Sequence, residues 1–239
     1  MANSELTPVE PWSTITKMNA FPSPDLPAGL RQLREAILAR GRRHDFEEGH
    51  SLQDEHLALR LFDETARLGL HDLADAERRG SGDLGIPLEV SPRNLLSFAA
   101  ILHDIGYTMG YEQHHKTAFN LIMAEPFPGL SARAQAIVAH VARYHRGSLP
   151  NPSRHEAFAA LSGEDQRLVT RLAAILRFAD GLDRSHTNAV ADLRCELAGD
   201  RLIVTLLPGR NDEPERWAGQ KKARFFEQVF GVKVVLESP

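Results

Sequence analysis

The apolar residues of this chain follow one period over most of its length and a second period after about residue 190. In the first part they recur every three or four positions, as they do on one face of an amphipathic helix. In the last part they alternate with polar residues, which is typical of a half-buried strand. The pattern therefore predicts a helical region followed by a short region of strands and one helix.

Local signals set the bounds of the predicted elements. Ser51 is expected to cap the second helix, which carries His56 and leaves His50 just before it. Ser91 and Pro92 stand in the order that favours a helix start. The helices are expected at residues 30–41, 51–68, 92–102, 114–124, 131–145, 155–160, 164–184 and 213–229. The strands are expected at residues 193–197, 202–207 and 232–236.

These elements divide the chain into three predicted parts. Residues 1–28 are rich in proline and should form an irregular N-terminal arm. Residues 29–188 should form a helical domain, and residues 189–239 should form a small α+β subdomain. The predicted fold class is thus mainly α, a helical bundle with a small C-terminal antiparallel β-sheet plus one helix.

Composition narrows the class of protein. The 239 residues carry a formal net charge of -4, so general nucleic-acid binding through a basic surface is not expected. A single cysteine, Cys195, excludes an internal disulfide framework and suits a reducing cytosol. No apolar run reaches the length of a membrane span, and the N-terminus lacks the order of a secretory signal. We therefore expect a cytoplasmic protein that has no membrane partner.

The candidate chemistry centres on His103 and Asp104, which close the apolar run Leu95–Leu102. Two titratable groups at the edge of a core favour a divalent-metal site, because an imidazole and a carboxylate both bind such ions. The same dipeptide occurs at 44–45, in a charged stretch, and at 71–72, where a helix is expected to end. We interpret those two pairs as solvated polar residues.

Two further residues complete a predicted ligand set. His56 lies beside the apolar stripe of its helix, and Asp180 borders the apolar face of another. Each has a simpler interpretation, His56 as a structural histidine and Asp180 as the salt-bridge partner of Arg177 or Arg184. With the His103-Asp104 pair they predict a site for Mn²⁺, Mg²⁺, Fe²⁺, Co²⁺ or Ni²⁺, which mixed His/Asp ligation does not distinguish. No other cofactor is indicated.

Histidine and cationic residues are dense in the middle of the chain. We interpret five of them as a phosphate-binding rim or as ligands of a second metal: His114, His115, His140, Arg143 and His145. At least two of the four histidines are as well explained as surface residues, so both interpretations stay open. Three further cations are expected to neutralise charge that develops on a phosphoryl group: Lys116, Arg146 and Arg184. Asp104 is also expected to assist proton transfer from water.

Four stretches carry a resemblance to a known family: Ile101–Tyr107, Ala142–Arg146, Leu176–His186 and Lys222–Gly231. Together they span roughly residues 45–237, and they make the chain similar to the HD-domain metal-dependent phosphohydrolase superfamily. Within it, the chain most resembles the C-terminal HD region of the exopolyphosphatase/guanosine pentaphosphatase family. The resemblance implies an HD-type helical bundle and metal-dependent phosphohydrolase chemistry.

The chain also departs from that family. Family enzymes hydrolyse polyphosphate or a pentaphosphate alarmone mainly through actin-like domains that precede the HD region, and this chain has no room for them. We therefore do not expect exopolyphosphatase activity to carry over by name. The family often shows a His-Lys-His-Ser run after the HD pair. Here residues 114–117 read His-His-Lys-Thr, one histidine short, which weighs against a second metal.

The sequence thus predicts a metal-dependent phosphohydrolase that cleaves a phosphoanhydride or phosphodiester of a small phosphorylated ligand, with a nucleotide favoured. The alternative is a catalytically silent regulatory module that binds polyphosphate or an alarmone. Local cations against a slightly acidic background favour a small ligand over a long polyanion. The sequence leaves open whether the chain forms a homodimer.

Overall fold

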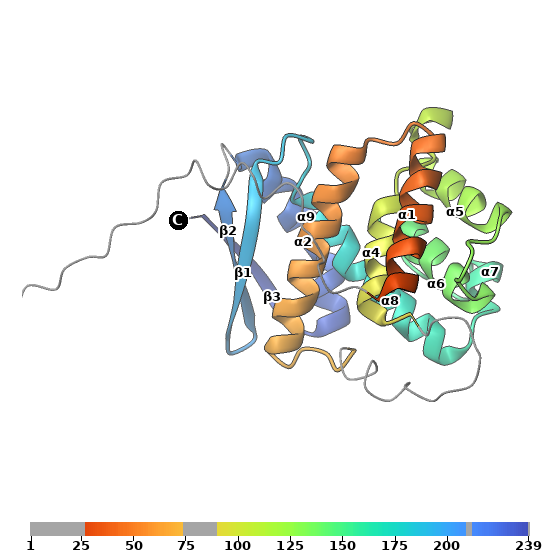
Figure 1. Cartoon of the computed structure of the whole chain (residues 1–239). Coiled ribbons are helices and arrows are strands. Elements are labelled where there is room, and N and C mark those ends of the chain that lie inside the picture. The colour runs from red at the N-terminus through yellow and green to blue at the C-terminus, as the bar shows by residue number, and fades with distance from the viewer. Residues whose placement is uncertain (1–26, 74–89, 209–211, 239) are drawn as a thin grey trace, which may run out of the picture.

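The computed structural model describes residues 27–73, 90–208 and 212–238, so that most of the arm expected over 1–28 lies outside it (Figure 1). The described chain forms eight α-helices and one three-stranded sheet. The helices are α1 (Ala28–Arg43), α2 (Glu48–Arg67), α4 (Pro92–Leu102), α5 (His114–Ala124), α6 (Ala132–Arg143), α7 (Glu156–Ala159), α8 (Gly163–Gly181) and α9 (Glu213–Phe230). The strands are β1 (Val190–Ala198), β2 (Arg201–Pro208) and β3 (Lys233–Glu237). The mainly helical prediction is confirmed.

The sheet differs from the prediction in the direction of one strand. β1 and β2 pair antiparallel, as expected, with Cys195 opposite Val204. β3 pairs parallel with β2, with Leu202 opposite Val234, so the sheet is mixed and the expected all-antiparallel sheet is wrong. The reason is the connection, because α9 carries the chain back along the sheet before β3 begins, as parallel pairing requires.

Three helices begin at serine caps, as helix-start signals predict. The Oγ atoms of Ser91, Ser131 and Ser162 accept hydrogen bonds from backbone N–H groups three residues on, at 3.0–3.2 Å. The expected cap at Ser51 is wrong, because α2 begins earlier, at Glu48, and Ser51 lies buried inside it. His50 therefore belongs to the first turn of α2 and does not precede the helix.

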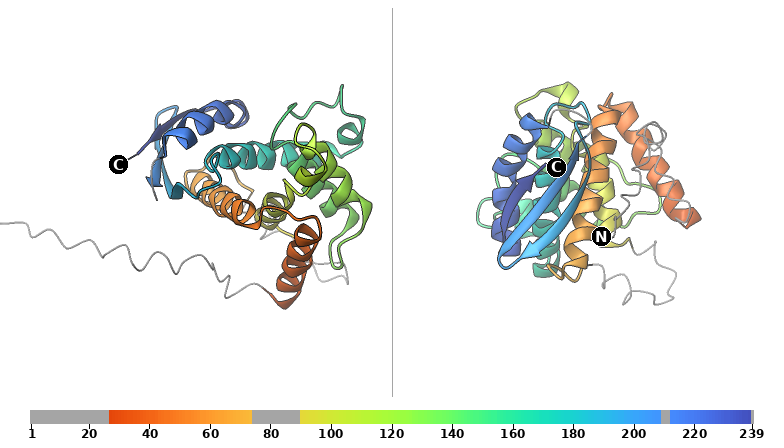
Figure 2. Two further views of the ribbon diagram at one scale, coloured as in Figure 1. Left: turned by 90° about the horizontal axis from the view of Figure 1, so that it is seen from above. Right: turned by 90° about the vertical axis from the view of Figure 1, so that its left-hand side faces the viewer.

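The core lies between the helices and continues under the sheet. α2 packs against α4, α8 and β1, while α6 packs against α4, α5 and α8. The apolar side chains at these contacts are fully buried, including Leu57, Leu61, Leu96, Val138 and Ile175. Figure 2 shows the sheet standing at one end of the helical bundle, with α9 alongside α8. Within the described ranges, no helix is long and apolar enough to cross a membrane.

Glycine permits a close crossing of α8 and α9. A Cβ added at Gly181 would lie 3.0 Å from the Cα of Gly219 and 3.2 Å from the carbonyl oxygen of Ala218. Such contacts leave no room for a larger side chain at this crossing. The crossing places the exposed side of α9 next to the C-terminal end of α8, where Asp180 lies.

A candidate metal centre beneath a cationic cleft

The ends of three helices meet at a buried cluster of histidine and aspartate. α2 supplies His50 and Asp54, one turn apart on the same face. His103 directly follows α4, and the last turn of α8 supplies Asp180. One side-chain ligand atom of each residue lies within 4.8 Å of the others. All four residues are buried, Asp180 the least so at 9% exposure.

A second group shares His103 with the first. His103, Asp104 and His145 also have ligand atoms within 4.8 Å of one another. His114, at the start of α5, joins them, because its Nε2 lies 3.0 Å from Asp104 Oδ1 and 3.2 Å from His145 Nε2. The His145 Nε2 lies 3.4 Å from the same Asp104 oxygen. Asp104 thus lies within the second group, where its Oδ1 faces the imidazoles of His103, His114 and His145.

The four imidazoles are oriented in the same way. Three Nδ1 atoms lie 2.7 Å from backbone carbonyl oxygens: His103 at Ala100, His114 at Tyr111 and His145 at Ala142. The Nδ1 of His50 lies 2.8 Å from the carboxylate of Asp183. Because these partners can only accept, each Nδ1 is a donor, and the Nε2 atom of each ring is the one that faces the carboxylates of the centre. This arrangement is the one that metal-binding histidines use.

Several polar atoms at the centre face one another at 3.4–3.5 Å without forming a hydrogen bond. His50 Nε2, His103 Nε2 and both Asp54 oxygens are buried without a hydrogen bond to any described residue. Buried polar atoms are nearly always satisfied, so this cluster calls for a bound group. A divalent cation fits the donor set, since it accepts imidazole nitrogen and carboxylate oxygen together.

The charges at the centre also fit a cation. Burial alone would lower the pKa of His50, but Asp54, Asp183 and Asp180 raise it to about 10. Burial would likewise raise the pKa of Asp104, but His103, His114 and His145 hold it well below its usual value. Several buried carboxylates therefore demand positive charge, which a proton on His50 or a bound cation can supply.

Asp180 has a cationic partner that the sequence did not assign. The Lys222 ammonium, from α9, makes a close ion pair with Asp180 Oδ2. Burial would raise the pKa of Asp180, but Lys222 and then His145 and His103 pull it well below its ordinary value. Neither salt bridge expected for Asp180, with Arg177 or with Arg184, is formed. Arg177 instead donates to the carbonyl oxygens of Tyr144, at 3.4 Å, and Gly147, at 3.1 Å.

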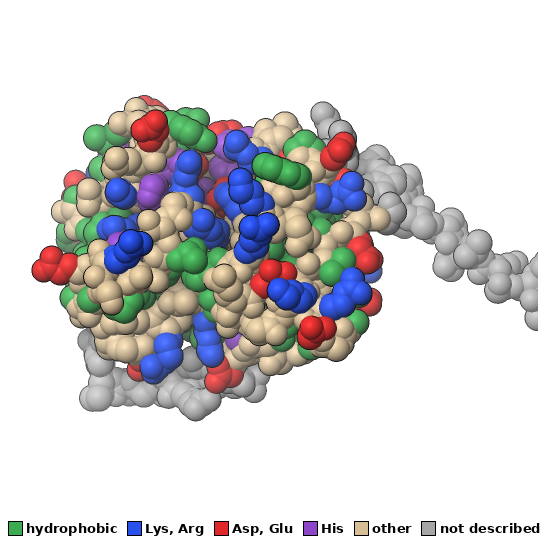
Figure 3. Space-filling view, turned by 180° about the vertical axis from the view of Figure 1, so that it is seen from behind, with side chains coloured by type: hydrophobic (Ala, Val, Ile, Leu, Met, Phe, Trp, Pro, Cys, Tyr) green, Lys and Arg blue, Asp and Glu red, His purple; other side chains and the backbone are tan. Residues whose placement is uncertain are grey.

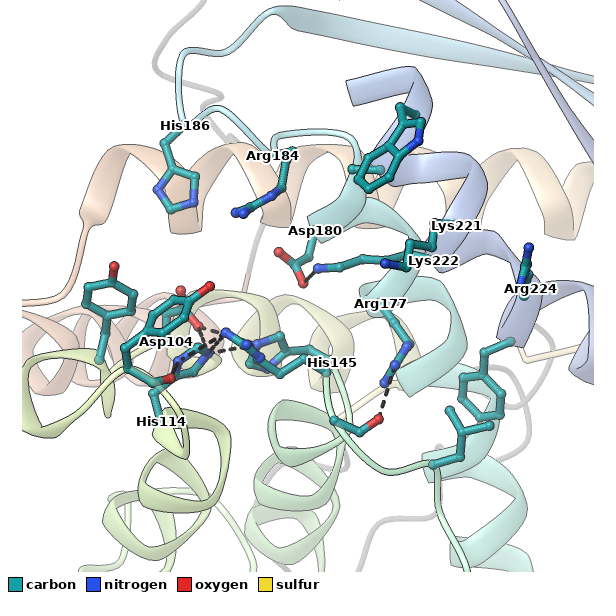
Figure 4. A pocket seen from close by; sticks show the side chains of 18 of the residues that line it. Asp104, His114, His145, Arg177, Asp180, Arg184, His186, Lys221, Lys222 and Arg224 are labelled. Atoms are coloured by element: carbon teal, nitrogen blue, oxygen red, sulfur yellow. Dashed lines mark hydrogen bonds and ion pairs between the residues drawn. The ribbon is translucent and has the colours of Figure 1, made fainter. Parts of the chain in front are cut away.

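A cleft of about 900 Å³ opens above this centre (Figure 4). Asp104, His114, His145 and Asp180 form part of its lining. Six cationic residues also line it: Arg146, Arg177, Arg184, Lys221, Lys222 and Arg224. The space-filling view shows histidine at the surface with Lys and Arg side chains gathered near it (Figure 3). A cleft of this size and charge suits a phosphorylated small molecule.

The structure brings together most, but not all, of the predicted ligands. His103 and Asp180 share the first group, Asp104 lies with His103 in the second group, and His56 joins neither. Its Nε2 lies 3.2 Å from Asp192 Oδ1 at strand β1, and His50 takes its place in the cluster. The physical reason is the early start of α2, which turns His50 and Asp54 toward the centre and His56 toward the sheet.

The predicted cationic and histidine rim is also only partly assembled. His114, His145, Arg146 and Arg184 line the cleft, whereas four of the expected residues are absent from its lining: His115, Lys116, His140 and Arg143. Lys116 is exposed and lies 3.4 Å from the side-chain oxygen of Gln113. The Arg143 guanidinium lies 5.3 Å from the ring centre of Phe119. These positions do not support the roles that the sequence suggested for them.

His140 is a core residue. It is 2% exposed and its ring packs against Phe119, Tyr144 and Phe158, with centroid distances of 4.8–5.9 Å. Burial, with a smaller effect of Arg143, lowers its pKa to about 4. The folded protein therefore holds this imidazole neutral at every pH above that value.

We expect His140 to make the protein less stable in acid. The unfolded chain takes up a proton at this residue near pH 6.5, but the folded chain does so only near pH 4. The contribution of the neutral His140 to the free energy of unfolding is therefore fully present above about pH 6.5. It is lost as the pH falls from 6.5 to 4, which lowers the free energy of unfolding by up to roughly 3 kcal/mol. His140→Phe should lose less stability than the wild type between pH 7 and pH 4.5, as measured by urea unfolding. If the free energy of unfolding fell equally with pH in the two proteins, His140 would not be the cause of the acid sensitivity.

Several residues of the cluster and of the cleft were missed by sequence reasoning, and most left a signal. His50 and Asp54 have the spacing of one helical turn, which marks a shared face once the helix start is correct. His186 stacks on His50 with a centroid distance of 3.7 Å and lines the cleft, and its Nδ1 lies 2.7 Å from Glu47 Oε2. Lys222 left no local signal, because only the packing of α9 on α8 brings it to Asp180.

Comparison with known families agrees with this geometry. Residues 34–211, about three quarters of the chain, match the family described as Ppx/GppA phosphatase, domain III. The match includes every helix that contributes to the His/Asp cluster, α2, α4 and α8, but stops before α9 and Lys222. Such membership suggests phosphatase chemistry on a small phosphorylated substrate such as polyphosphate or a nucleotide. The chain belongs to the Ppx/GppA phosphatase family, through its domain III.

Proposed function

We propose that this chain is a metal-dependent phosphohydrolase that cleaves a phosphoanhydride or phosphodiester of a small ligand, with nucleotides as the substrate class. One observation carries the proposal: four imidazoles present Nε2 to a buried set of carboxylates, directly beneath a cationic cleft. Cations in the cleft suit a phosphoryl group, and the cluster suits the ion that would act on it.

The proposed ligands follow the structure, with His50 in place of His56. His50, His103 and Asp180 would hold the ion, with Asp54 or Asp104 completing the set. A second ion, if bound, would have His114, His145 and Asp104 as its ligands. When bound, a divalent ion supplies Lewis acidity toward a phosphoryl oxygen and toward water. The donor set does not choose among Mn²⁺, Mg²⁺, Fe²⁺, Co²⁺ and Ni²⁺.

The residues of the cleft would bind and orient the phosphoryl group. Arg146 and Arg184 lie on the cleft wall, where they can neutralise charge that builds up on phosphoryl oxygens. Lys222 is already placed at Asp180, within reach of any group bound there. The low pKa of Asp104 keeps its carboxylate ionised at neutral pH. That state suits a ligand or a hydrogen-bond acceptor for water and argues against Asp104 as a general acid.

The test is a metal analysis followed by a phosphatase screen with added Mn²⁺. Purified protein should contain a divalent metal and turn over a small nucleotide or phosphoester. Asp104→Ala should abolish both, whereas Asp72→Ala should abolish neither, because Asp72 is exposed, although its neighbour His71 is buried and not solvated as the sequence suggested. Arg184→Ala should lower kcat/KM by about 10-fold or more, since a hydrogen bond to a charged group is worth about 1.5–3 kcal/mol.

The opposite result would favour the alternative function. Tight binding of long polyphosphate, with no turnover of any phosphoester at saturating Mn²⁺, would make the chain a binding module. Equal losses in Asp104→Ala and Asp72→Ala would show that the wrong His-Asp pair had been assigned.

A further inference from the structure

One face of α9 presents an aromatic side chain and two cationic side chains to the cleft. Trp217, Lys221, Arg224 and Gln228 are spaced four, three and four residues apart, so they form a single stripe along the helix. All four are exposed, and all four line the cleft. The stripe thus extends the cleft away from the buried centre, along a helix that the match to domain III does not include.

Two of the cations that line the cleft near this stripe lack acidic partners. Neither Arg184 nor Arg224 forms a hydrogen bond or ion pair with any residue that the structure describes. The two acidic residues among those that line the cleft, Asp104 and Asp180, belong to the buried centre. Positive charge that is left unbalanced on a concave wall is suited to more than one phosphate group.

Trp217 is the most exposed large hydrophobic residue of the described chain, at 68%. It lies where the cleft meets a second hollow of about 630 Å³, which Lys221 and Arg224 also border. The Lys221 ammonium lies 5.2 Å from its ring centroid, which fits a cation–π contact. An exposed indole beside unpaired cations is the combination that proteins use to bind an aromatic base that carries phosphates.

We propose that Trp217 is the platform on which the base of a nucleoside polyphosphate stacks. The neighbouring residues on α9 connect this platform to the centre, because Lys221 contacts Trp217 and Lys222, the next residue, pairs with Asp180. Figure 4 shows Arg184, Lys221 and Lys222 around Asp180. A phosphate bound by Lys221 or Arg184 therefore lies between the base and the buried cluster. This inference rests on the proposed function for its chemistry, but the platform can be tested separately.

The two tyrosines on the opposite wall are a weaker alternative. Tyr107 and Tyr111 pack against each other at 5.6 Å and against His114 at 5.6 and 5.9 Å. The Arg146 guanidinium also lies 4.9 Å from the Tyr111 ring. These rings already have partners at the centre, whereas Trp217 contacts only the side chain of Lys221 among the ring and cation contacts of the described residues.

The kinetic test compares two substrates that share the triphosphate group, a purine nucleoside triphosphate and inorganic tripolyphosphate. Trp217→Ala should raise KM for the nucleotide by about 10-fold or more, the usual effect of losing one stacking partner. It should leave kcat/KM for tripolyphosphate unchanged, and Trp217→Phe should restore most of the nucleotide affinity. Met123→Ala, an exposed residue outside the cleft lining, is the matched control and should change neither. Equal losses on both substrates in Trp217→Ala would overturn the proposal.

A binding measurement separates this proposal from the proposed function. Trp12 and Trp217 are the two tryptophans of the chain, so in Trp12→Phe protein the tryptophan fluorescence comes from Trp217 alone. The nucleoside triphosphate should quench this fluorescence, and tripolyphosphate should not. Quenching by the nucleotide without any turnover would uphold the platform and contradict the hydrolase. Turnover of tripolyphosphate without quenching by the nucleotide would overturn the platform and leave the hydrolase standing.

Discussion

His50→Ala should remove metal from the protein and reduce hydrolysis to background, whereas His56→Ala should leave both close to wild type. His50 presents Nε2 to the centre, and its Nδ1 is held by Asp183 at 2.8 Å. Its loss removes a ligand and leaves Asp54 without the imidazole that faces it. We expect metal affinity to fall by more than about 100-fold, beyond the usual cost of losing only an outer-shell partner. Metal content by mass spectrometry and turnover with Mn²⁺ are the measurements.

His56→Ala is the matched control because it lies on the same helix, six residues further along. Its ring pairs with Asp192 at the sheet, outside the cluster, so its loss should affect stability only modestly. Circular dichroism should show that both variants keep their helices. Metal loss in His56→Ala together with normal metal content in His50→Ala would restore the ligand set that the sequence first suggested.

Gly106→Ala should destabilise the protein and weaken the site. A Cβ at Gly106 would overlap the carbonyl oxygen of His114 and would lie 2.7 Å from the backbone nitrogen of Ala118. Both atoms belong to the backbone of α5, so a small rotamer change cannot relieve the clash, and the helix itself must move. We expect a loss of about 1–3 kcal/mol of unfolding free energy, measured by urea denaturation. The movement should also carry His114 away from Asp104 and lower turnover.

Gly49→Ala provides the comparison for this substitution. Gly49 lies in α2, is exposed, and has nothing within 4 Å of an added Cβ. Alanine there should be neutral or stabilising by up to about 1 kcal/mol, since glycine is the poorer helix former. If Gly106→Ala unfolded at the same urea concentration as the wild type, the close approach of Gly106 to the backbone of α5 would not be a constraint.

The part of the site that lies inside helices with clear apolar stripes could be predicted. His103 and Asp104 follow an apolar run that is buried in the structure, and Asp180 ends another buried stripe. His50 was missed because Ser51 looked like a cap. The helix begins at Glu48 without a side-chain cap hydrogen bond, so the local signal pointed to the wrong turn. Because the helix start was placed about one turn too late, His56 was chosen as the ligand and His50 was placed outside the helix.

Features that depend on tertiary packing were beyond the sequence pattern. Alternation of apolar residues predicts that β3 exists but carries no information on its direction, which α9 determines. In the same way, nothing in the neighbourhood of Lys222 shows that it will meet Asp180. His140, by contrast, shares the apolar periodicity of α6, and its burial follows from the face on which it lies. Its assignment to a phosphate rim relied on its being a histidine and overlooked that it lies on the buried face of α6.

The place of Lys222 on the last described helix has a consequence for the order in which the protein forms. During synthesis the helices that carry the cluster emerge first, and the counterion of Asp180 emerges after the strands β1 and β2. A buried carboxylate without a partner is costly, so the C-terminal end of α8 should remain hydrated or take up a proton until α9 arrives. Docking of α9 across Gly181 and Gly219 would then expel that water and complete the centre in a single late step.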